Sequence, residues 1–377
     1  MAIETTKEFA RKLLEQADIK IDGSRPWDVR ILNDAVYGRV MNEGPLGLGE
    51  SYMDGWWEAE KLDEFFYRLI KADLVKYAKE NWRSMLWIMG QTIFNRQDKK
   101  GALEVGEQHY DLGNDLYRIM LDMRMTYTCG YWNPPAGGAK NLDEAQEAKL
   151  DLVCKKINLK PGETVLDIGC GWGSFAKFAA EKYGAEVTGI TISKEQAELA
   201  KKLCEGLPVK ILFQDYRDLE GKFDHIVSLG MFEHVGYRNY RDYMQIAHDH
   251  LKDGGFFLLH TIGSDVSIKR TDPWLGKYIF PNSMLPSIAQ IGASIEGLFV
   301  MEDWHNFGAD YDKTLMAWFE NFEKGWPMLK KKYDERFYRM WRYFLNSTAA
   351  GFRARKTQLW QIVLSKDGVP GGYSPIR

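Results

Sequence analysis

One glycine-rich turn, placed between an apolar segment and a helical one, constrains the fold of this chain more than any other feature. Residues 165–173 read Val-Leu-Asp-Ile-Gly-Cys-Gly-Trp-Gly. The first four are typical of a buried strand, and residues 174–183 have the apolar spacing of a helix. A strand, a turn without bulky side chains and a helix can hold a ligand against bare backbone at the helix N-terminus. The turn therefore predicts a nucleotide-type ligand site in an α/β fold.

Two positions in and beside this turn narrow the identity of the ligand. Asp167, at the end of the apolar segment, can pair with a cationic group. The dinucleotide fingerprint G-x-G-x-x-G requires glycine or alanine at position 174, where this chain has Ser174. The residues favour S-adenosylmethionine, whose amino group suits an acid and which brings no pyrophosphate. An NAD-dependent oxidoreductase is the weakest alternative.

Strand-like apolar segments alternate with helical ones from about residue 141 onward, which predicts a parallel sheet covered on both faces. Asn141-Leu-Asp-Glu144 and Ser193-Lys-Glu-Gln196 resemble capping boxes that open two of the helices. Because the carboxyl ends of parallel strands meet at one edge of the sheet, ligand groups are expected to collect there. The expected strands are 165–168, 186–192, 209–213, 225–229 and 256–262.

Reactive or polar residues stand at or after the end of each expected strand. Taken singly, each is at least as consistent with a helix cap or a core position as with a ligand site. Their joint placement is the argument, because together they offer an acid, ribose-binding groups and a ring that could stack on adenine. They are Asp167 on the first strand, Thr191 and Gln196 with the second, Gln214, Asp215 and Tyr216 with the third, Glu233 with the fourth and His260 on the fifth.

The length and the net charge of the chain limit the number of its domains and the kinds of partner it can bind. A chain of 377 residues is long enough for two domains. We expect a mainly helical N-terminal domain over residues 1–94, a polar linker over 95–107 and the α/β domain over 108–377. The net charge of −3 gives no global field that favours nucleic acid.

Cysteine, histidine and hydropathy patterns argue against other classes of site. The four cysteines show no metal-ligand spacing, and His248 and His250 point to different sides of an expected helix, so no metal site is expected. The N-terminus lacks the profile of a signal peptide, and no apolar run reaches the roughly 18 residues of a membrane span. We therefore expect reduced thiols and a cytoplasmic protein that at most touches a membrane.

Two segments combine basic with aromatic residues. Residues 68–100 hold eight basic residues against three acidic ones, and residues 330–356 hold nine against two. Both also carry large apolar side chains, and this combination suits an anionic membrane surface. Two ordinary amphipathic helices with solvated charges explain the pattern about equally well.

A series of segments in a fixed order resembles the cyclopropane-fatty-acyl-phospholipid synthase family. The resemblance runs from about residue 30 to residue 364 and is closer to the bacterial phospholipid enzymes than to their mycolic-acid relatives. Besides the glycine-rich turn, the segments that carry it are 127–132 (Tyr-Thr-Cys-Gly-Tyr-Trp), 189–193, 214–218, 230–236 (Gly-Met-Phe-Glu-His-Val-Gly), 258–263, 277–282 and 302–311.

The resemblance implies a class I S-adenosylmethionine-dependent methyltransferase domain, Rossmann-like, with a smaller, mainly helical N-terminal domain. The family moves the methyl group of S-adenosylmethionine onto a cis double bond of a phospholipid acyl chain. Methyl addition leaves a carbocation, and a base must then remove a proton from the new methyl group so that the ring closes. A bound bicarbonate ion is the implied base. Its family ligands map to Cys129, Glu233, His260, the backbone at Ile262, and Tyr311.

The same resemblance assigns the cofactor and substrate contacts. Aromatic faces attract a cation by roughly 0.5–2 kcal/mol, so rings are expected along the substrate channel. The channel candidates are Tyr110, Tyr278, Phe280 and Tyr311; core packing is the alternative and is favoured for Phe280. For the cofactor, Tyr127 and Thr128 are expected at the methionine end above Gly169 and Gly171, Thr191 and Gln196 at the ribose, and Tyr216 with Gln214 or Asp215 at adenine.

The implied partners are unsaturated phospholipids in an anionic membrane surface and a second copy of the chain. We expect a homodimer at the inner face of the cytoplasmic membrane, with Trp56-Trp57 and the basic segment from residue 62 to 94 as candidates for docking. Thr348 stands where some family members have a cysteine, so a mechanism that needs a thiol there is excluded. Two alternatives stay open: a methyltransferase that makes methyl-branched acyl chains or methylates another small substrate, and a lipid-binding module with an inactive core.

Overall fold

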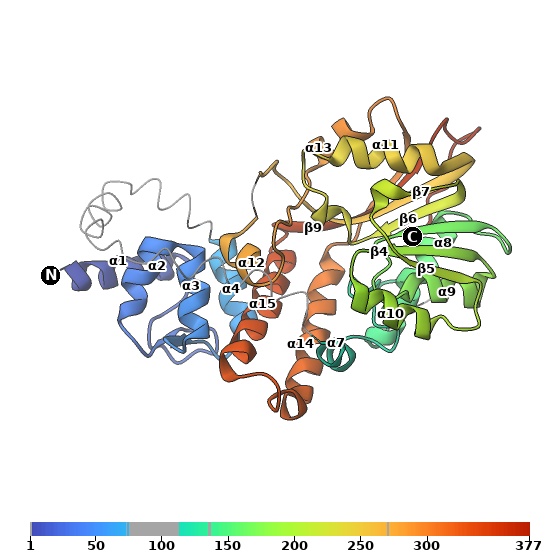
Figure 1. The fold of residues 1–377 in the computed structure, drawn as a ribbon. Coiled ribbons are helices and arrows are strands. Elements are labelled where there is room, and N and C mark those ends of the chain that lie inside the picture. The colour runs from blue at the N-terminus through green and yellow to red at the C-terminus, as the bar shows by residue number, and fades with distance from the viewer. Residues whose placement is uncertain (1, 73, 75–112, 135–136, 270) are drawn as a thin grey trace. The chain divides into compact units, whose positions relative to one another are not determined.

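Two compact units make up the computed structural model, which describes residues 2–72, 74, 113–134, 137–269 and 271–377 (Figure 1). Neither unit is a single stretch of chain. Unit 1 comprises residues 1–120, 271–281 and 318–356, and unit 2 comprises residues 121–270, 282–317 and 357–377.

Unit 2 is built on a sheet that, among the described residues, has seven strands in the order β5-β4-β3-β6-β7-β9-β8. The first five in this order are parallel, whereas β9 runs antiparallel to β7 and β8. The strands are β3 (Thr164–Ile168), β4 (Glu186–Thr191), β5 (Val209–Phe213), β6 (Phe223–Leu229), β7 (Leu251–Ser264), β8 (Val300–Asn306) and β9 (Thr357–Ser365).

Helices cover both faces of this sheet, as the alternating sequence pattern predicts. The prediction of parallel β3 to β7 is confirmed, but the antiparallel strands β8 and β9 were not expected. The helical elements of unit 2 are α8 (Leu142–Lys156), α9 (Ser174–Tyr183), α10 (Lys194–Leu203), η1 (Tyr216–Asp218), η2 (Phe232–His234), α11 (Tyr240–His250), α13 (Ile288–Ile295) and the first part of α14 (Ala309–Leu329).

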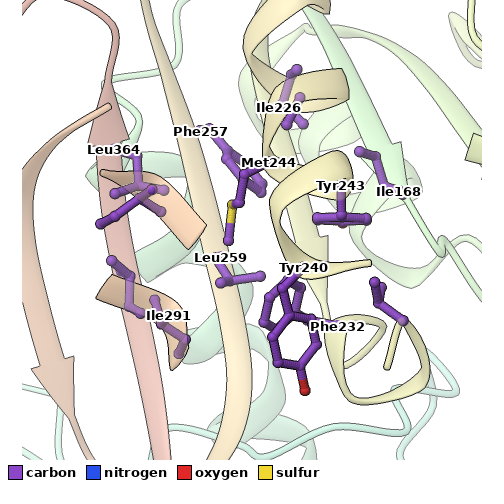
Figure 2. Packing of buried hydrophobic residues seen from close by; sticks show 14 of the residues in the cluster. Ile168, Ile226, Phe232, Tyr240, Tyr243, Met244, Phe257, Leu259, Ile291 and Leu364 are labelled. Carbon is purple, nitrogen blue, oxygen red and sulfur yellow. The ribbon is translucent and has the colours of Figure 1, made fainter. Parts of the chain in front are cut away.

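The strands distribute their side chains between two cores, because successive residues of a strand point to opposite faces. On one face, Leu166 and Ile168 pack in a cluster with α11 and α13. Figure 2 shows this cluster, in which the rings of Phe232 and Tyr240 stack with centroids 4.2 Å apart. On the other face, Val165 packs with residues of α8 and α9. Asp167, two residues after Val165, therefore faces α8.

Unit 1 is mainly helical among its described residues. Its core gathers aromatic rings from distant parts of the sequence: Tyr343 lies 4.8 Å from Phe66 and 4.3 Å from Trp274, between ring centroids. Its elements are α1 (Ala2–Gln16), β1 (Arg30–Ile31), α2 (Ala35–Glu43), α3 (Pro45–Met53), β2 (Trp57–Glu58), α4 (Leu62–Lys71), α7 (Asn114–Met120), α12 (Pro273–Tyr278), the rest of α14, and α15 (Glu335–Arg353).

Among the described residues, several of the aromatic residues proposed for membrane docking lie in this core. Trp57 is buried, and its Nε1 donates to the carbonyl of Leu48 at 3.1 Å. The three apolar residues Trp341, Phe344 and Phe352 of α15 are also buried. Apart from the half-buried Phe337 and Tyr338, the aromatic side chains of α15 therefore pack inside the protein, as in an ordinary amphipathic helix.

The division into units differs from the domain boundaries expected from the sequence. Residues 271–281 and 318–356, expected in the C-terminal domain, group with the N-terminal part of the chain. The expected linker at 95–107, most of the helix expected from 62 to 94, and Tyr110 lie outside the described residues. No helix in the described part of the chain is both long and apolar enough to cross a membrane.

Candidate active site

The segment that carries Tyr127, Thr128 and Cys129 is held between α8 and the start of α14. On the α8 side, Gln146 Nε2 donates to the carbonyl of Thr128 at 2.7 Å. On the α14 side, Thr314 Oγ1 accepts from the amide of Gly130 at 3.1 Å and donates to the carbonyl of Asp310 at 3.0 Å. These bonds fix an irregular segment that has no sheet or helix ladder of its own.

Glu233 lies in η2, directly after β6, and reaches across to the end of β7. Its Oε1 accepts from the amide of Ile262 at 2.6 Å, so that this backbone donor is already in use. Its other carboxylate oxygen, Oε2, is buried and has no hydrogen-bond partner in the described part of the protein. Burial raises the pKa of Glu233 to about 7. The carboxyl group can therefore accept or donate a hydrogen bond near neutral pH.

His260 is the second group with an unpartnered buried atom. It pairs across strands with Gln361 of β9, and Gln361 Nε2 donates to His260 Nδ1 at 3.3 Å. Burial lowers the pKa of His260 well below its usual range, so the ring is neutral. Since Nδ1 accepts, the single ring proton lies on Nε2, which has no partner among the described residues. His260 thus presents an N–H donor.

Cys129 and Tyr311 are both buried and neutral. Burial raises the pKa of the Cys129 thiol well above its usual range, and Sγ donates to the carbonyl of Gly130 at 3.1 Å. Burial, and then the nearby Cys129 and Glu233, raise the pKa of Tyr311 well above its usual range. These couplings place Tyr311 within electrostatic reach of both groups. Tyr311 is thus linked to Cys129 and to Glu233, and His260 lies two residues before the Ile262 amide that holds Glu233. That all four side chains converge on one ligand stays a prediction.

The glycine-rich turn follows β3, as expected, and is anchored to β4 by two backbone bonds: the amides of Gly169 and Cys170 donate to the carbonyl of Ile190 at 3.0 and 2.9 Å. Gly169 and Gly171 have φ of 83° and 54°. A Cβ at Gly169 would lie 2.7 Å from Met231, whereas one at Gly171 would meet nothing within 4 Å. The turn therefore has open space on the side of Gly171.

Asp167 lies beside this turn, and its Oδ2 is buried without a hydrogen-bond partner among the described residues. Burial raises the pKa of Asp167 to about 7, and Lys149 lowers it in part. A cationic group placed against Oδ2 would satisfy this oxygen and favour the charged carboxylate. The amino group of S-adenosylmethionine is a cation of this kind, so the residues present fit the cofactor expected from the sequence.

The residues expected at ribose and adenine follow β4 and β5. Thr191 Oγ1 donates to Gln196 Oε1 at 3.0 Å, and the amide of Gln214 donates to the carbonyl of Thr191 at 3.0 Å. Asp215 caps η1 by accepting from the amide of Arg217 at 2.9 Å. Tyr216 is buried in the core cluster, with its ring 5.0 Å from that of Tyr243. Stacking of Tyr216 on adenine stays a prediction.

Two of the expected channel residues belong to unit 1. Tyr278 is buried, and its hydroxyl donates to Glu50 Oε1 at 2.8 Å. Phe280 packs edge-on against Phe344, with centroids 5.6 Å apart. Both side chains have partners within unit 1, as core packing requires, and a role in a substrate channel stays a prediction.

Sequence reasoning missed three buried polar residues that contact the expected site: Lys149, Thr314 and Gln361. Lys149 Nζ donates to Thr128 Oγ1 at 2.6 Å. The signal for Lys149 was present in the sequence, because it shares a helix face with Ala145 and Val153 at spacings of four residues. A lysine on the apolar face of a helix is an exception that calls for a partner.

A small molecule with both acceptors and a donor would satisfy the unpartnered atoms at the ends of β6 and β7. Bicarbonate has this character: its oxygens can accept from the His260 N–H, and its hydroxyl can donate to Glu233 Oε2. The donor set present therefore fits the ion expected from the sequence. No group of three or more potential metal ligands occurs in the described part of the chain.

Comparisons with known proteins place the whole chain in a family. The family model of mycolic acid cyclopropane synthetase matches residues 97–362. The chain is 54% identical over 369 residues to a cyclopropane-fatty-acyl-phospholipid synthase of Escherichia coli strain K12, covering 98% of this chain and 95% of the relative. The cyclopropane synthase MmaA2 from Mycobacterium tuberculosis has a similar structure, with a TM-score of 0.65, 30% identity and coverage of 72% and 100% of the two chains. The mycolic acid cyclopropane synthase CmaA1, complexed with SAH and CTAB, gives a TM-score of 0.63, 31% identity and coverage of 69% and 97%.

Proposed function

The chain belongs to the mycolic acid cyclopropane synthetase family, and we propose that it forms a cyclopropane ring on a cis double bond of an unsaturated phospholipid acyl chain. It is an S-adenosylmethionine-dependent enzyme with the fold of the methyltransferases. The similarity to the Escherichia coli synthase extends over almost the whole of both chains, which favours a phospholipid over a mycolic acid as the substrate.

The pair of unpartnered buried atoms, Glu233 Oε2 and His260 Nε2, is the main support for the mechanism. A buried polar atom without a partner costs about 1–3 kcal/mol, so two such atoms in one site favour a bound ligand. A bound bicarbonate ion would supply the base for the proton that must leave the new methyl group. His260 would donate to this ion, Glu233 would accept from it, and the Cys129 thiol and Tyr311 hydroxyl are further donors.

Neutral side chains suit the cationic intermediate of the reaction. The alkene attacks the methyl carbon of the sulfonium, the carbon–sulfur bond breaks, and positive charge is left on the acyl chain. A thiolate or a free imidazole lone pair would attack this carbocation. Cys129 is held as a thiol, and the only lone pair on the His260 ring nitrogens is engaged by Gln361. The side chains can therefore hold a base without themselves trapping the intermediate.

The glycine-rich turn and its neighbours would hold the methyl donor. S-adenosylmethionine supplies the methyl group on a positively charged sulfur. Asp167 would take its amino group, because Oδ2 is the unpartnered oxygen beside the turn. The open side of Gly171 would leave room for the ligand, and Thr191 and Gln196 offer a hydroxyl and an amide to the ribose.

Deuterium retention tests ring formation against simple methylation. The purified protein is incubated with S-adenosylmethionine that carries a CD₃ group and with vesicles of mono-unsaturated phospholipid, and the lipid is analysed by mass spectrometry and proton NMR. A cyclopropane keeps two of the three deuterium atoms, because one leaves as the ring closes. A methyl-branched alkene, which forms when the proton leaves the acyl chain instead of the new methyl group, keeps all three, and this result would favour the branched-chain alternative.

Glu233→Ala tests the anion site within the same assay. We expect loss of turnover, while Glu186→Ala, which removes an exposed carboxylate at the start of β4 in the same unit, leaves turnover unchanged. Wild-type turnover should also fall when bicarbonate is removed from the buffer. Full activity of Glu233→Ala would exclude the bicarbonate mechanism but leave the reaction itself in place.

We further propose that the protein works as a homodimer on an anionic membrane at the inner face of the cytoplasmic membrane. The turn between α14 and α15 supports a membrane contact, since Met328 is 62% exposed and is followed by the exposed Lys330 and Lys331. An apolar group beside lysines suits a surface of acidic headgroups. Two such turns in a dimer would bind far more tightly than one.

Vesicle sedimentation and sedimentation equilibrium test this proposal. We expect binding to vesicles that contain phosphatidylglycerol, weaker binding to neutral vesicles, and loss of binding at high salt. The double charge reversal Lys330→Glu with Lys331→Glu should weaken binding, whereas the matched pair Lys201→Glu with Lys202→Glu on α10 should have less effect. Binding that is equal for all variants would exclude this turn, and a monomer at micromolar concentration would exclude the dimer.

A further inference from the structure

A buried lysine on α8 has no role in the reaction described above. Lys149 has 0% of its surface exposed. Its Nζ donates to Thr128 Oγ1 at 2.6 Å, and within the described ranges no carboxylate lies within 4 Å of it. Burying an ammonium group without a contacting anion is costly, because the group loses its hydration. Folding alone therefore gives little reason for a lysine at this position.

The carboxylate that acts most strongly on Lys149 already has hydrogen-bond donors of its own. Asp122 acts on Lys149 at longer range, but its carboxylate accepts from the amides of Thr126 and Arg124 at 2.7 and 3.0 Å. Burial lowers the pKa of Lys149 to about 8, which leaves the side chain charged at neutral pH. A positive charge that no carboxylate contacts directly thus stays beside Thr128.

Thr128 relays this charge toward the ligand site. Its Oγ1 accepts from Lys149, so the hydroxyl proton is free to point elsewhere. Thr128 is partly exposed, whereas Lys149 is not, and a ligand can thus reach the hydroxyl but not the ammonium. Asp167, which faces α8 from β3, is the acidic counterpart on the other side. The Lys149–Thr128 pair is suited to an anionic ligand group, and Asp167 is suited to a cationic one.

We propose that Lys149 is a positioning residue that, through the Thr128 hydroxyl, supplies the positive charge for the carboxylate of the methionine part of S-adenosylmethionine. This inference rests on the proposed function, because it assumes that S-adenosylmethionine is the ligand. The amino acid end of the ligand is a zwitterion. Its amino group would meet Asp167, and its carboxylate would accept from Thr128, whose hydroxyl is polarised by the ammonium behind it.

Two ligands that differ only in this end separate the proposed role from a structural one. S-adenosylhomocysteine has the amino acid end, whereas 5′-methylthioadenosine has the same nucleoside thioether without it. Calorimetry should show that Lys149→Met weakens binding of S-adenosylhomocysteine by about 10- to 100-fold, the loss expected for a hydrogen bond to a charged group. Binding of 5′-methylthioadenosine should change less than about threefold.

Lys156→Met is the matched control. Lys156 lies on the same helix and is equally buried, but its Nζ contacts His305 Nδ1 at 3.0 Å and lies 3.6 Å from Asp303. This variant should bind both ligands as the wild type does. Thr128→Val, which removes the relay and keeps the lysine, should show the same selective loss as Lys149→Met, and it serves if Lys149→Met does not fold.

The possible outcomes distinguish a failure of the Lys149 proposal from a failure of the proposed function. An equal loss of affinity for both ligands in Lys149→Met and Thr128→Val would overturn the proposal in favour of a structural role. Unchanged affinity for both ligands would overturn it as well. If the wild type binds 5′-methylthioadenosine and S-adenosylhomocysteine equally, the amino acid end is not recognised and the inference fails while the nucleoside site stands. If the wild type binds neither, the proposed function itself fails.

Discussion

At the scale of single residues, burial keeps Cys129, Tyr311 and His260 uncharged. The thiol of Cys129 and the hydroxyl of Tyr311 have raised pKa values, and the imidazole of His260 has a lowered one. In water, two of these groups would be potential nucleophiles near neutral pH. In this site they are hydrogen-bond donors, which suits a reaction that passes through a carbocation.

The raised pKa of Glu233 leads to a prediction about stability. The carboxyl has a pKa of about 7 in the folded protein and an ordinary value near 4.5 when unfolded. The folded state therefore binds more protons between these values, and the free energy of unfolding of the wild type falls as pH rises through this window. Glutamine does not titrate, so the free energy of unfolding of Glu233→Gln does not fall for this reason. Its stability relative to the wild type should increase by about 2–3 kcal/mol between pH 5 and pH 8.

Urea denaturation of both proteins at several pH values, without ligands and in bicarbonate-free buffer, measures this difference. Asp167 titrates in both proteins, so its contribution cancels in the difference between their free energies of unfolding. Glu186→Gln, which changes an exposed side chain at the start of β4, is the matched control. A difference between Glu233→Gln and the wild type that stays constant from pH 5 to pH 8 would contradict a buried, protonated Glu233.

Gln361 gives a second prediction at this scale. Its amide holds the proton of His260 on Nε2, so Gln361→Leu should release the ring to either tautomer. Losing one hydrogen bond of about 1 kcal/mol should lower kcat by about fivefold, with little change in the KM for S-adenosylmethionine. Gln358→Leu, on the same strand but bonded to Asn306 at 2.6 Å, is the control. Equal kcat values for wild type and Gln361→Leu would remove the positioning role of Gln361.

At the scale of elements, two glycines of the glycine-rich turn have different roles: one is needed for folding and the other for ligand binding. Gly169 has no room for a side chain, since a Cβ would lie 2.7 Å from Met231, whereas Gly171 faces open space. Both have positive φ, which costs a non-glycine residue about 1 kcal/mol. Gly169→Ala should therefore destabilise the protein by clearly more than Gly171→Ala.

The effect on ligand binding should follow a different rule, because the open space beside Gly171 is where the ligand is proposed to lie. Gly171→Ala should keep a melting temperature within a few degrees of the wild type and still bind S-adenosylhomocysteine at least about tenfold more weakly. Calorimetric melting and titration of the two variants give both quantities. Normal affinity in Gly171→Ala would place the ligand away from this turn.

The elements also show how far sequence reasoning reached. The turn at 165–173 and the alternating pattern predicted β3 to β7 with their helices, because parallel βα units carry local signals in their apolar runs and caps. β9 was missed, since it pairs with β7 across about a hundred residues and is continuously buried, so it shows no alternation. Register across such a distance is not a local property of the sequence.

The same distinction applies to the site. The ends of the expected strands pointed to Glu233 and His260, and the resemblance to a family added Cys129 and Tyr311. In the structure, Tyr311 is coupled electrostatically to Cys129 and to Glu233. Lys149 and Gln361 were missed because each acts through one partner that only the folded chain brings near. A lysine on an apolar helix face gives a sequence signal, whereas a glutamine in a buried strand gives almost none.

At the scale of the whole molecule, the chain returns to unit 1 after building much of unit 2. Helix α15 belongs to unit 1, where Arg353 Nη1 pairs with Asp63 Oδ2 at 2.8 Å and Tyr343 packs against Phe66 of α4. The expected boundary at residue 107 therefore cuts through one compact unit. In a fragment that begins at residue 108, the remaining helices of unit 1 lose the N-terminal helices against which their buried side chains pack.

A fragment of residues 108–377 tests this division. It keeps α15 but lacks α3 and α4, so Tyr343 and the buried apolar residues beside it would face water. Exposed apolar patches of this kind cause association, and we expect this fragment to elute as aggregates from gel filtration and to bind a hydrophobic dye. Deletion of residues 1–16 removes only α1, whose described side chains are mostly half-buried or exposed, and it should leave a monodisperse protein. A fragment 108–377 that melts cooperatively and binds S-adenosylhomocysteine with full affinity would show that α15 does not need the N-terminal helices, and the sequence-based boundary would then describe the folding units better than the contacts do.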